Sequence, residues 1–125
     1  MTPEGAVPKA KGLNWLGTRT DRFEETIWFL QEVLGLKLQH KGDDFAILQL
    51  DDGTHVEVFG PDEKDHPFMT TGPVVGFKVD DVRAARREME AAGIEFLDAE
   101  VQTFKGSSWT HFRGPDGNVY QIADD

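Results

Sequence analysis

The order of hydrophobic and polar positions predicts a strand followed by an amphipathic helix near the start of the chain. Residues 13–20 read as the strand. The next segment carries Phe23, Ile27, Leu30 and Leu34 at spacings of four, three and four, which is typical of a helix with one buried face.

The ends of this helix and the strands after it can also be predicted. Asp21, with Glu24 three residues later, fits a capping box at the helix start, and Gly35 fits a left-handed end. Strands are expected at residues 36–44, 45–50 and 54–59, with a tight turn at 51–53.

After residue 61 the same order of elements returns. A strand at 73–79 is followed by a helix that Asp80 or Asp81 caps and Gly93 ends. The remaining elements are expected as strands at 94–101, 109–113 and 119–123, with a loop at 104–108. Residues 15–21 (WLGTRTD) align with residues 74–80 (VVGFKVD), and we interpret this as an internal repeat.

The repeat predicts an α+β fold. Two tandem βαβββ units are expected to form one curved, mainly antiparallel sheet of eight strands around a cavity, with the helices outside. We expect one domain over residues 1–125. Within it, residues 1–12 form a loose arm, 13–61 the first unit, 62–72 a linker and 73–125 the second unit.

Composition narrows the classes of partner. The formal net charge of −10 disfavours nucleic acid and anionic membranes as partners. It is consistent either with attraction of a cationic ligand or with solubility alone. The chain has no cysteine, which excludes disulfides and thiolate metal sites. It shows neither a secretory signal nor an apolar run of about 20 residues, so we expect a cytoplasmic protein.

Strand alternation assigns side chains to the cavity side of the sheet. These candidate ligand-binding residues are Trp15, Arg19, Glu57, Lys78, Trp109, His111 and Gln121. The alternative for the two tryptophans is that they fill the cavity, and for Arg19 and Lys78 that they are solvated or paired with neighbouring acids. An inward carboxylate needs a partner or a function. Glu57 is therefore expected to pair with Arg19 or Lys78, to anchor a ligand, or to act as a general base. His111 should pair with Gln121 across strands, either as a structural group or as a group that moves protons. His66 is expected on the surface.

Four segments resemble the vicinal oxygen chelate superfamily, which includes glyoxalase I, bleomycin-resistance proteins and extradiol dioxygenases. They are residues 28–36 (WFLQEVLGL), 77–82 (FKVDDV), 91–96 (AAGIEF) and 113–118 (RGPDGN). The resemblance covers residues 13–125 and implies a homodimer. It also implies metal ligands at positions 15, 57, 74 and 121, where this chain has Trp15, Glu57, Val74 and Gln121.

Indole and isopropyl groups cannot coordinate a metal, so we expect no metal and no cofactor at the family position. A different site from His55, Glu57, His111 and Gln121 stays a minor alternative. The first interpretation of function is a small-molecule binder that sequesters a cationic aromatic compound. The second is a lyase, isomerase or dioxygenase-like enzyme in which Glu57 and His111 are catalytic. The third is an interaction module without a ligand.

Overall fold

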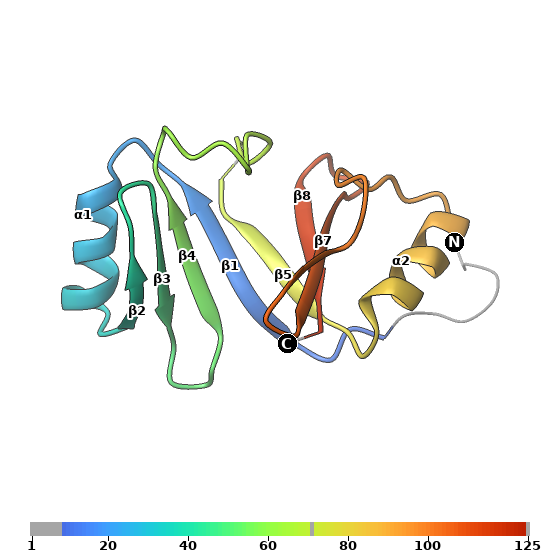
Figure 1. The fold of residues 1–125 in the computed structure, drawn as a ribbon, viewed down its shortest axis with the longest axis horizontal. Helices are drawn as coiled ribbons and strands as arrows, with labels where there is room; N and C mark the ends of the chain where they lie inside the picture. The colour runs from blue at the N-terminus through green and yellow to red at the C-terminus, as the bar shows by residue number, and fades with distance from the viewer. Residues whose placement is uncertain (1–8, 71, 125) are drawn as a thin grey trace. The chain divides into compact units, whose positions relative to one another are not determined.

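The computed structural model describes residues 9–70 and 72–124, which form an α+β fold of eight strands and two helices. Figure 1 shows the path of the chain through these elements. In chain order they are β1 (Leu13–Arg19), α1 (Phe23–Trp28) with its π-helical continuation η1 (Phe29–Val33), β2 (Lys37–Lys41), β3 (Phe45–Gln49), β4 (His55–Phe59), β5 (Val74–Lys78), α2 (Val82–Ala91), β6 (Gln102–Phe104), β7 (Ser107–Arg113) and β8 (Val119–Ala123).

The chain divides into two compact units, the first from Trp15 to Val74 and the second from residues 9–14 and 75–124. The strand order is β2-β3-β4-β1 in the first unit and β5-β8-β7-β6 in the second. The pairs β1/β4 and β5/β8 are parallel, and the four other pairs inside the units are antiparallel. The predicted α+β class and the mainly antiparallel pairing are thus confirmed.

The register of the two parallel pairs confirms the internal repeat. Gly17 of β1 lies opposite Glu57 of β4, and Gly76 of β5 lies opposite Gln121 of β8. The two units therefore place an acid and an amide at corresponding positions beside a glycine.

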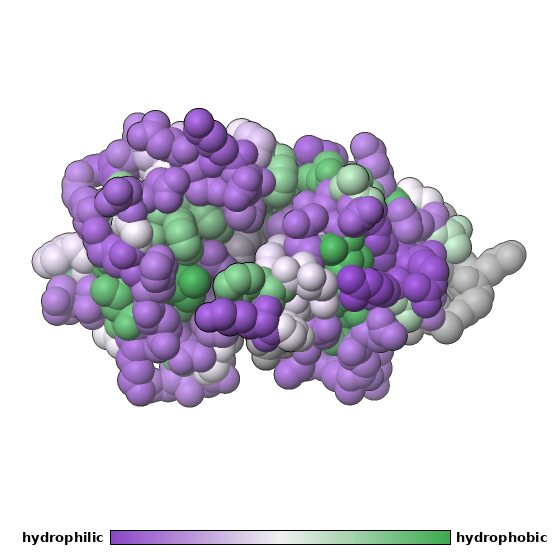
Figure 2. Space-filling view, in the orientation of Figure 1, coloured by the Kyte–Doolittle hydropathy of each residue, from purple (hydrophilic) through white to green (hydrophobic). Residues whose placement is uncertain are grey.

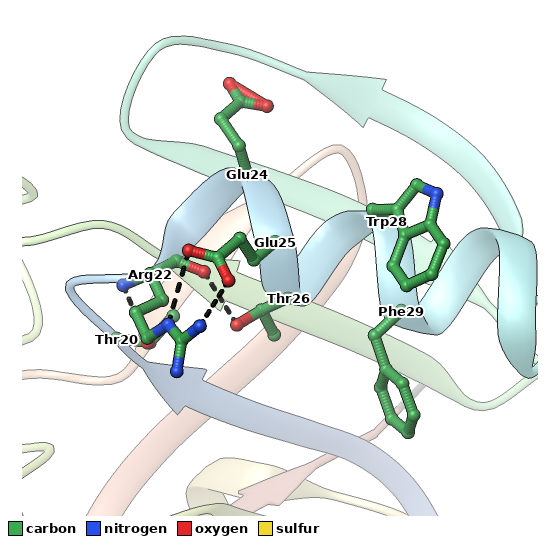
Figure 3. Close-up of a pocket in the computed structure, with 7 residues that line it drawn as sticks. All are labelled: Thr20, Arg22, Glu24, Glu25, Thr26, Trp28 and Phe29. Carbon is green, nitrogen blue, oxygen red and sulfur yellow. Dashed lines mark hydrogen bonds and ion pairs between the residues drawn. The ribbon is translucent and has the colours of Figure 1, made fainter.

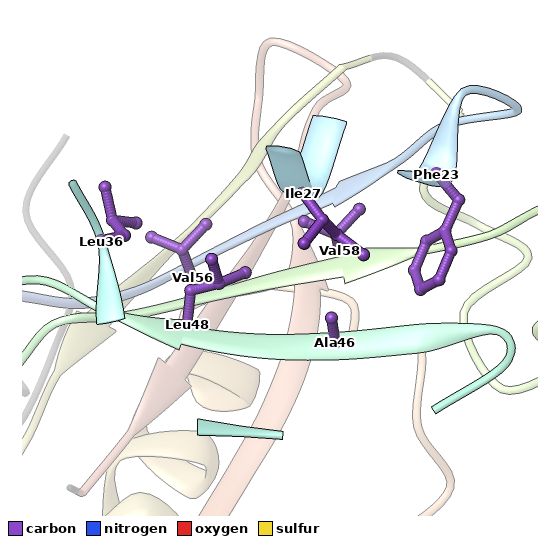
Figure 4. Close-up of a cluster of buried hydrophobic side chains, with 7 residues drawn as sticks. All are labelled: Phe23, Ile27, Leu36, Ala46, Leu48, Val56 and Val58. Carbon is purple, nitrogen blue, oxygen red and sulfur yellow. The ribbon is translucent and has the colours of Figure 1, made fainter. Parts of the chain in front are cut away.

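The core of the first unit lies between α1 and one face of its sheet, as Figure 4 shows. Because side chains alternate along a strand, Val56 and Val58 face α1 while Glu57 between them faces away from it. The buried members of this cluster are Phe23, Ile27, Leu36, Ala46, Leu48, Val56 and Val58.

The predicted start of the first helix is wrong. The helix begins with Arg22 as its N-cap residue, and no side chain caps it. The backbone N–H of Arg22 donates to Thr20 Oγ1 at 2.9 Å. Asp21 and Glu24 form no capping box, because the helix starts one residue later than the pattern suggests and leaves Asp21 outside the first turn.

The predicted buried face also fails at the end of this helix. The N–H of Leu34 donates to the carbonyl of Phe29, five residues back, at 3.1 Å. Such a π-type turn inserts one residue and rotates the following side chains around the helix axis. Leu34 is therefore 58% exposed instead of buried. Gly35 has a φ of 77° and ends the helix as predicted.

The core of the second unit lies between α2 and the sheet of this unit. Val82 and Ala85 of α2 pack with Phe112 of β7 and Ile122 of β8. The helix start agrees with the sequence, because the Asp81 side chain accepts a hydrogen bond from the N–H of Ala84 at 3.0 Å.

The strand predicted at residues 94–101 is wrong. Only Phe96 forms an isolated bridge to Phe112, and the second strand of the unit is β6 (Gln102–Phe104), of which Phe104 alone falls in the loop predicted at 104–108. A side chain interrupts the ladder, since Asp98 Oδ2 takes the N–H of His111 at 2.6 Å. Arg86 in turn donates to the carbonyl of Asp98 at 2.8 Å. The N–H of His111 and the carbonyl of Asp98 therefore both have side-chain partners in place of a neighbouring strand.

Most of the predicted arm at residues 1–12 lies outside the described residues. Its last part is not loose, because Lys11 and Gly12 exchange backbone hydrogen bonds with Lys78 at 2.8 Å each. Lys11 also pairs with Asp80 at 2.6 Å.

Hydrophilic residues cover most of the face seen in Figure 2, which agrees with the 29% of charged residues. Among the described residues, no helix has the length and apolar character that crossing a membrane requires.

Candidate functional site

Trp15 and Glu57 lie together on the face of the first sheet that points away from α1. The indole Nε1–H of Trp15 donates to Glu57 Oε1 at 2.9 Å. Trp15 is only 7% exposed, whereas the Glu57 side chain is half-buried. The predicted strand parity therefore holds for this pair.

Gly17 makes room for the indole. A Cβ atom built on Gly17 would lie 2.1 Å from Cη2 of Trp15 and 2.8 Å from Cε of Met69. Real side chains do not approach so closely, so any residue larger than glycine would displace the ring. The indole thus extends over Gly17 towards Glu57, which pairs with Gly17 across the two strands.

The expectation that Glu57 pairs with Arg19 or Lys78 is wrong. In the part of the chain that the structure describes, its one polar side-chain partner is Trp15. Arg19 binds Glu63 instead, at 3.3 Å between Nη1 and Oε1. Lys78, at the end of β5, is exposed. Arg19 is only partly buried, and the carbonyls of Pro61 and Glu63 accept two further hydrogen bonds from its guanidinium, which direct it to Glu63 and not to Glu57.

Glu63 is a buried acid that the sequence did not reveal. It accepts hydrogen bonds from the N–H groups of Asp65 and His66 at 2.9 and 3.0 Å, and from Nδ1 of His66 at 3.1 Å. Burial raises the pKa of Glu63, but these hydrogen bonds outweigh burial and hold it below the usual value. His66 stacks on Phe59 with 4.2 Å between ring centroids, so it is not a free surface residue.

A second polar cluster lies in the other unit, around His111 of β7. His111 is 2% exposed and pairs with Gln121 as predicted. Its Nδ1 lies 3.1 Å from Asp98 Oδ2, and the same oxygen accepts from Thr110 Oγ1 at 3.0 Å. Burial raises the pKa of Asp98, but the hydrogen bonds and charge of His111 outweigh burial and hold this pKa below its usual value.

Two other predicted site residues also lie in the second unit. Gln121 is buried on β8, on the opposite face from Tyr120 and Ile122, which pack against α2. Trp109 is partly buried on β7, opposite Ala123 in register. Asp98, like Glu63, was missed, because an acid in a polar segment has no periodic signal that separates it from a surface residue.

An open hollow of about 560 Å³ lies beside α1, and none of the candidate residues above lines it. Figure 3 shows Trp28 and Phe29 along one side of it and Arg22 paired with Glu25 along the other. Trp28 is 59% exposed there. Within residues 9–70 and 72–124, no three histidine, aspartate or glutamate side chains gather as metal ligands.

The arrangement of strand, helix and three strands, present twice, defines the class of fold. The family model of the Glyoxalase/Bleomycin resistance protein/Dioxygenase superfamily matches residues 12–122. The chain therefore belongs to this superfamily, which confirms the resemblance seen in the sequence.

A curated relative and several solved structures are similar to the chain. The uncharacterized protein YwbC of Bacillus subtilis is 26% identical over 117 residues, which cover 86% of this chain and 93% of YwbC. A methylmalonyl-CoA epimerase from Mycobacterium tuberculosis has a TM-score of 0.74 at 16% identity, covering 94% of this chain and 90% of the epimerase.

A second solved structure is a methylmalonyl-CoA epimerase of Streptomyces coelicolor in complex with 2-nitronate-propionyl-CoA. Its TM-score is 0.70 at 18% identity, over 92% of this chain and 97% of the epimerase. At this level of identity, the solved structures establish the fold of the chain and not its ligand.

Proposed function

We propose that the protein binds a small cationic aromatic molecule through Glu57 and Trp15, without a metal ion. The observation that carries the proposal is the hydrogen bond from the Trp15 indole to Glu57 Oε1 at 2.9 Å. It fixes the carboxylate while Oε2 stays available to accept from a ligand. A carboxylate and an indole side by side suit a cation attached to a planar ring.

The charge of the chain supports a cationic ligand. A net charge of −10 raises the local concentration of cations near the protein and speeds their association. Glu57 is half-buried, and a carboxylate in such surroundings gains more from a charged partner than an exposed one does.

The donor set does not fit the family metal. The indole of Trp15 gives its N–H to Glu57 and has no lone pair to offer a cation. Val74 has no donor atom, and Gln121 supplies a neutral amide. Elemental analysis of the purified protein tests this part of the proposal. A stoichiometric transition metal bound by wild type would contradict it.

The binding proposal is tested by tryptophan fluorescence titration with monocationic aromatic compounds and their neutral isosteres. Wild type is expected to bind the cations in preference. Glu57→Gln should weaken binding by about tenfold or more, because hydrogen bonds to charged groups contribute about 1.5–3 kcal/mol. Trp15→Phe should remove most of the signal change.

Two control variants address the hollow beside α1. Trp28→Phe and Glu25→Gln change residues that line this hollow and should leave the affinity unchanged. Loss of binding in these two variants, with normal binding by Glu57→Gln, would move the ligand to α1 and contradict the proposal. A complete lack of binding by wild type would contradict it as well.

A second candidate is an enzyme that uses acid–base chemistry. One observation favours it: the 3.1 Å contact between His111 Nδ1 and Asp98 orients the ring as a carboxylate orients a catalytic histidine. The epimerases among the solved structures suggest a substrate to try. Incubation with methylmalonyl-CoA in D₂O, followed by mass spectrometry, should show deuterium uptake that His111→Gln or Glu57→Gln abolishes. The absence of uptake by wild type would dismiss this substrate.

The family also suggests a homodimer. Light scattering after gel filtration should give about twice the mass of the 14.0 kDa chain. A monomer at micromolar concentration would contradict this expectation.

A further inference from the structure

The connecting segment at residues 60–70 is fixed to the first sheet by one arginine. Arg19, at the end of β1, donates to the carbonyl oxygens of Pro61 at 2.9 Å and Glu63 at 2.7 Å. It also pairs with the carboxylate of Glu63 at 3.3 Å. A guanidinium with several fixed acceptors holds a chain segment in a single arrangement. We call this set of contacts the Arg19–Glu63 clamp.

The same segment is ordered from within. Glu63 accepts the N–H groups of Asp65 and His66, which closes the turn that follows it. The His66 ring stacks on Phe59 of β4, so the middle of the segment also rests on the sheet. These contacts and the Arg19–Glu63 clamp together fix the position of the residues that follow His66, which include Met69.

Met69 is brought by this segment to the indole of Trp15. It is 3% exposed, although it belongs to a connecting segment. Its Cε and the Cη2 of Trp15 lie 2.8 and 2.1 Å from one point, the place where a Cβ on Gly17 would be. The thioether methyl therefore lies near the Cη2 and Cζ2 end of the indole, along the same edge as the Nε1–H that binds Glu57.

Glu57 and Met69 thus both lie along the edge of the Trp15 indole that carries Nε1. A planar ligand whose cation binds Glu57 and whose ring follows this edge meets Met69. Methionine has three rotatable bonds and adapts to different shapes, but Met69 is 3% exposed, so the residues packed around it limit how far its side chain can yield to a ligand. The size of residue 69 then limits the size of the ligand.

We propose that Met69 is a specificity-determining residue, which covers the edge of Trp15 and sets the length of planar ligand that Glu57 and Trp15 accept. The Arg19–Glu63 clamp is the positioning device that keeps Met69 there. This inference rests on the proposed binding function of Trp15 and Glu57.

The covering of the Trp15 edge by Met69 is tested first, without ligand. With Trp28→Phe and Trp109→Phe, Trp15 is the one remaining tryptophan of the three in the sequence. In this background Met69→Ala should increase acrylamide quenching of Trp15, and Glu63→Gln should increase it through release of the clamp. Met89→Ala is the matched control, because Met89 packs against the core of the other unit. Quenching that stays unchanged in Met69→Ala would overturn the inference.

The selectivity is tested next, with pairs of cationic aromatic compounds that differ by one methylene or one ring. Met69→Ala should shift the ratio of their dissociation constants towards the larger compound by about tenfold, as one methylene in an apolar site is worth ~10–200-fold. Met89→Ala should leave this ratio unchanged.

The outcomes separate this inference from the proposed function. Binding that Glu57→Gln weakens, together with an unchanged ratio in Met69→Ala, overturns the role of Met69 alone. A failure of wild type and of Met69→Ala to bind any cationic aromatic compound overturns both.

Discussion

Glu63 in the first unit and Asp98 in the second are both carboxylates on connecting segments, but they join different parts of the molecule. Glu63 accepts the N–H groups of residues two and three positions further along its own segment, and Arg19 adds one contact to β1. Asp98 accepts from Thr110 and from two nitrogens of His111, which lie on β7.

The two acids differ in how much of the fold depends on their hydrogen bonds. Glu63 organises a local turn, so its loss should loosen one segment. Asp98 takes the place of a backbone acceptor at the edge of β7 and joins its own segment to this buried strand. Hydrogen bonds that satisfy the buried donors of Thr110 and His111 contribute to global stability. We therefore expect substitutions at Asp98 to have the larger effect.

The largest expected effect is that of Asp98→Ala. The change removes the acceptor for the His111 N–H, the Thr110 hydroxyl and the His111 ring together. A buried donor that loses its acceptor costs about 1–3 kcal/mol, so the free energy of unfolding should fall by ~3 kcal/mol. Urea denaturation followed by circular dichroism measures it.

Glu100→Ala is the matched control for this prediction. Glu100 lies in the same segment, is exposed, and contributes only its backbone carbonyl to a recorded hydrogen bond. Its substitution should change the free energy of unfolding by less than about 0.5 kcal/mol. Equal effects of the two substitutions would show that Asp98 does not fasten the segment.

A smaller effect is expected from acid. In the folded protein, the pKa values of Glu63 and Asp98 are below their usual values, because hydrogen bonds outweigh the opposing effect of burial. A lowered folded pKa stabilises the fold above the unfolded pKa, and this contribution is lost as the pH falls through the folded value.

The free energy of unfolding should therefore decrease as the pH falls below about 4. Glu63→Gln and Asp98→Asn should each flatten this dependence, by at most ~1.4 kcal/mol per pH unit, the limit for one proton. Chemical denaturation at a series of pH values provides the test. A slope identical to that of wild type in both variants would refute the assignment.

Alternation along strands made much of the fold and part of the site predictable from the sequence. It placed Trp15 and Glu57 on one face, and counting from the last turn paired His111 with Gln121. These are local properties, which the order of residues carries directly. The family resemblance pointed to the same positions independently.

The contacts of the polar side chains were not predictable in the same way. Nothing local distinguishes Glu63 from the other acids of residues 61–65 (PDEKD), and its burial depends on Arg19, which lies 44 residues earlier. The strand expected at 94–101 failed for a similar reason, because Asp98 occupies a backbone position of the ladder through a tertiary contact. Helix starts are intermediate between strand alternation and these tertiary contacts. The capping residue can be read from the local sequence, but the backbone conformation that lets it cap depends on the rest of the fold.

The smallest predicted effect compares the two helix starts. Asp81 accepts the N–H of Ala84 at the start of α2, whereas α1 has no side-chain cap and Asp21 lies outside it. Asp81→Ala should lower the free energy of unfolding by about 1 kcal/mol, while Asp21→Ala should change it by less than ~0.5 kcal/mol. Both aspartates are exposed residues before a helix, so each variant controls for the other. Urea midpoints measured under identical conditions decide the comparison. A loss at Asp21 as large as that at Asp81 would mean that Asp21 caps α1 in solution after all, as the pattern of residues 21–24 suggests.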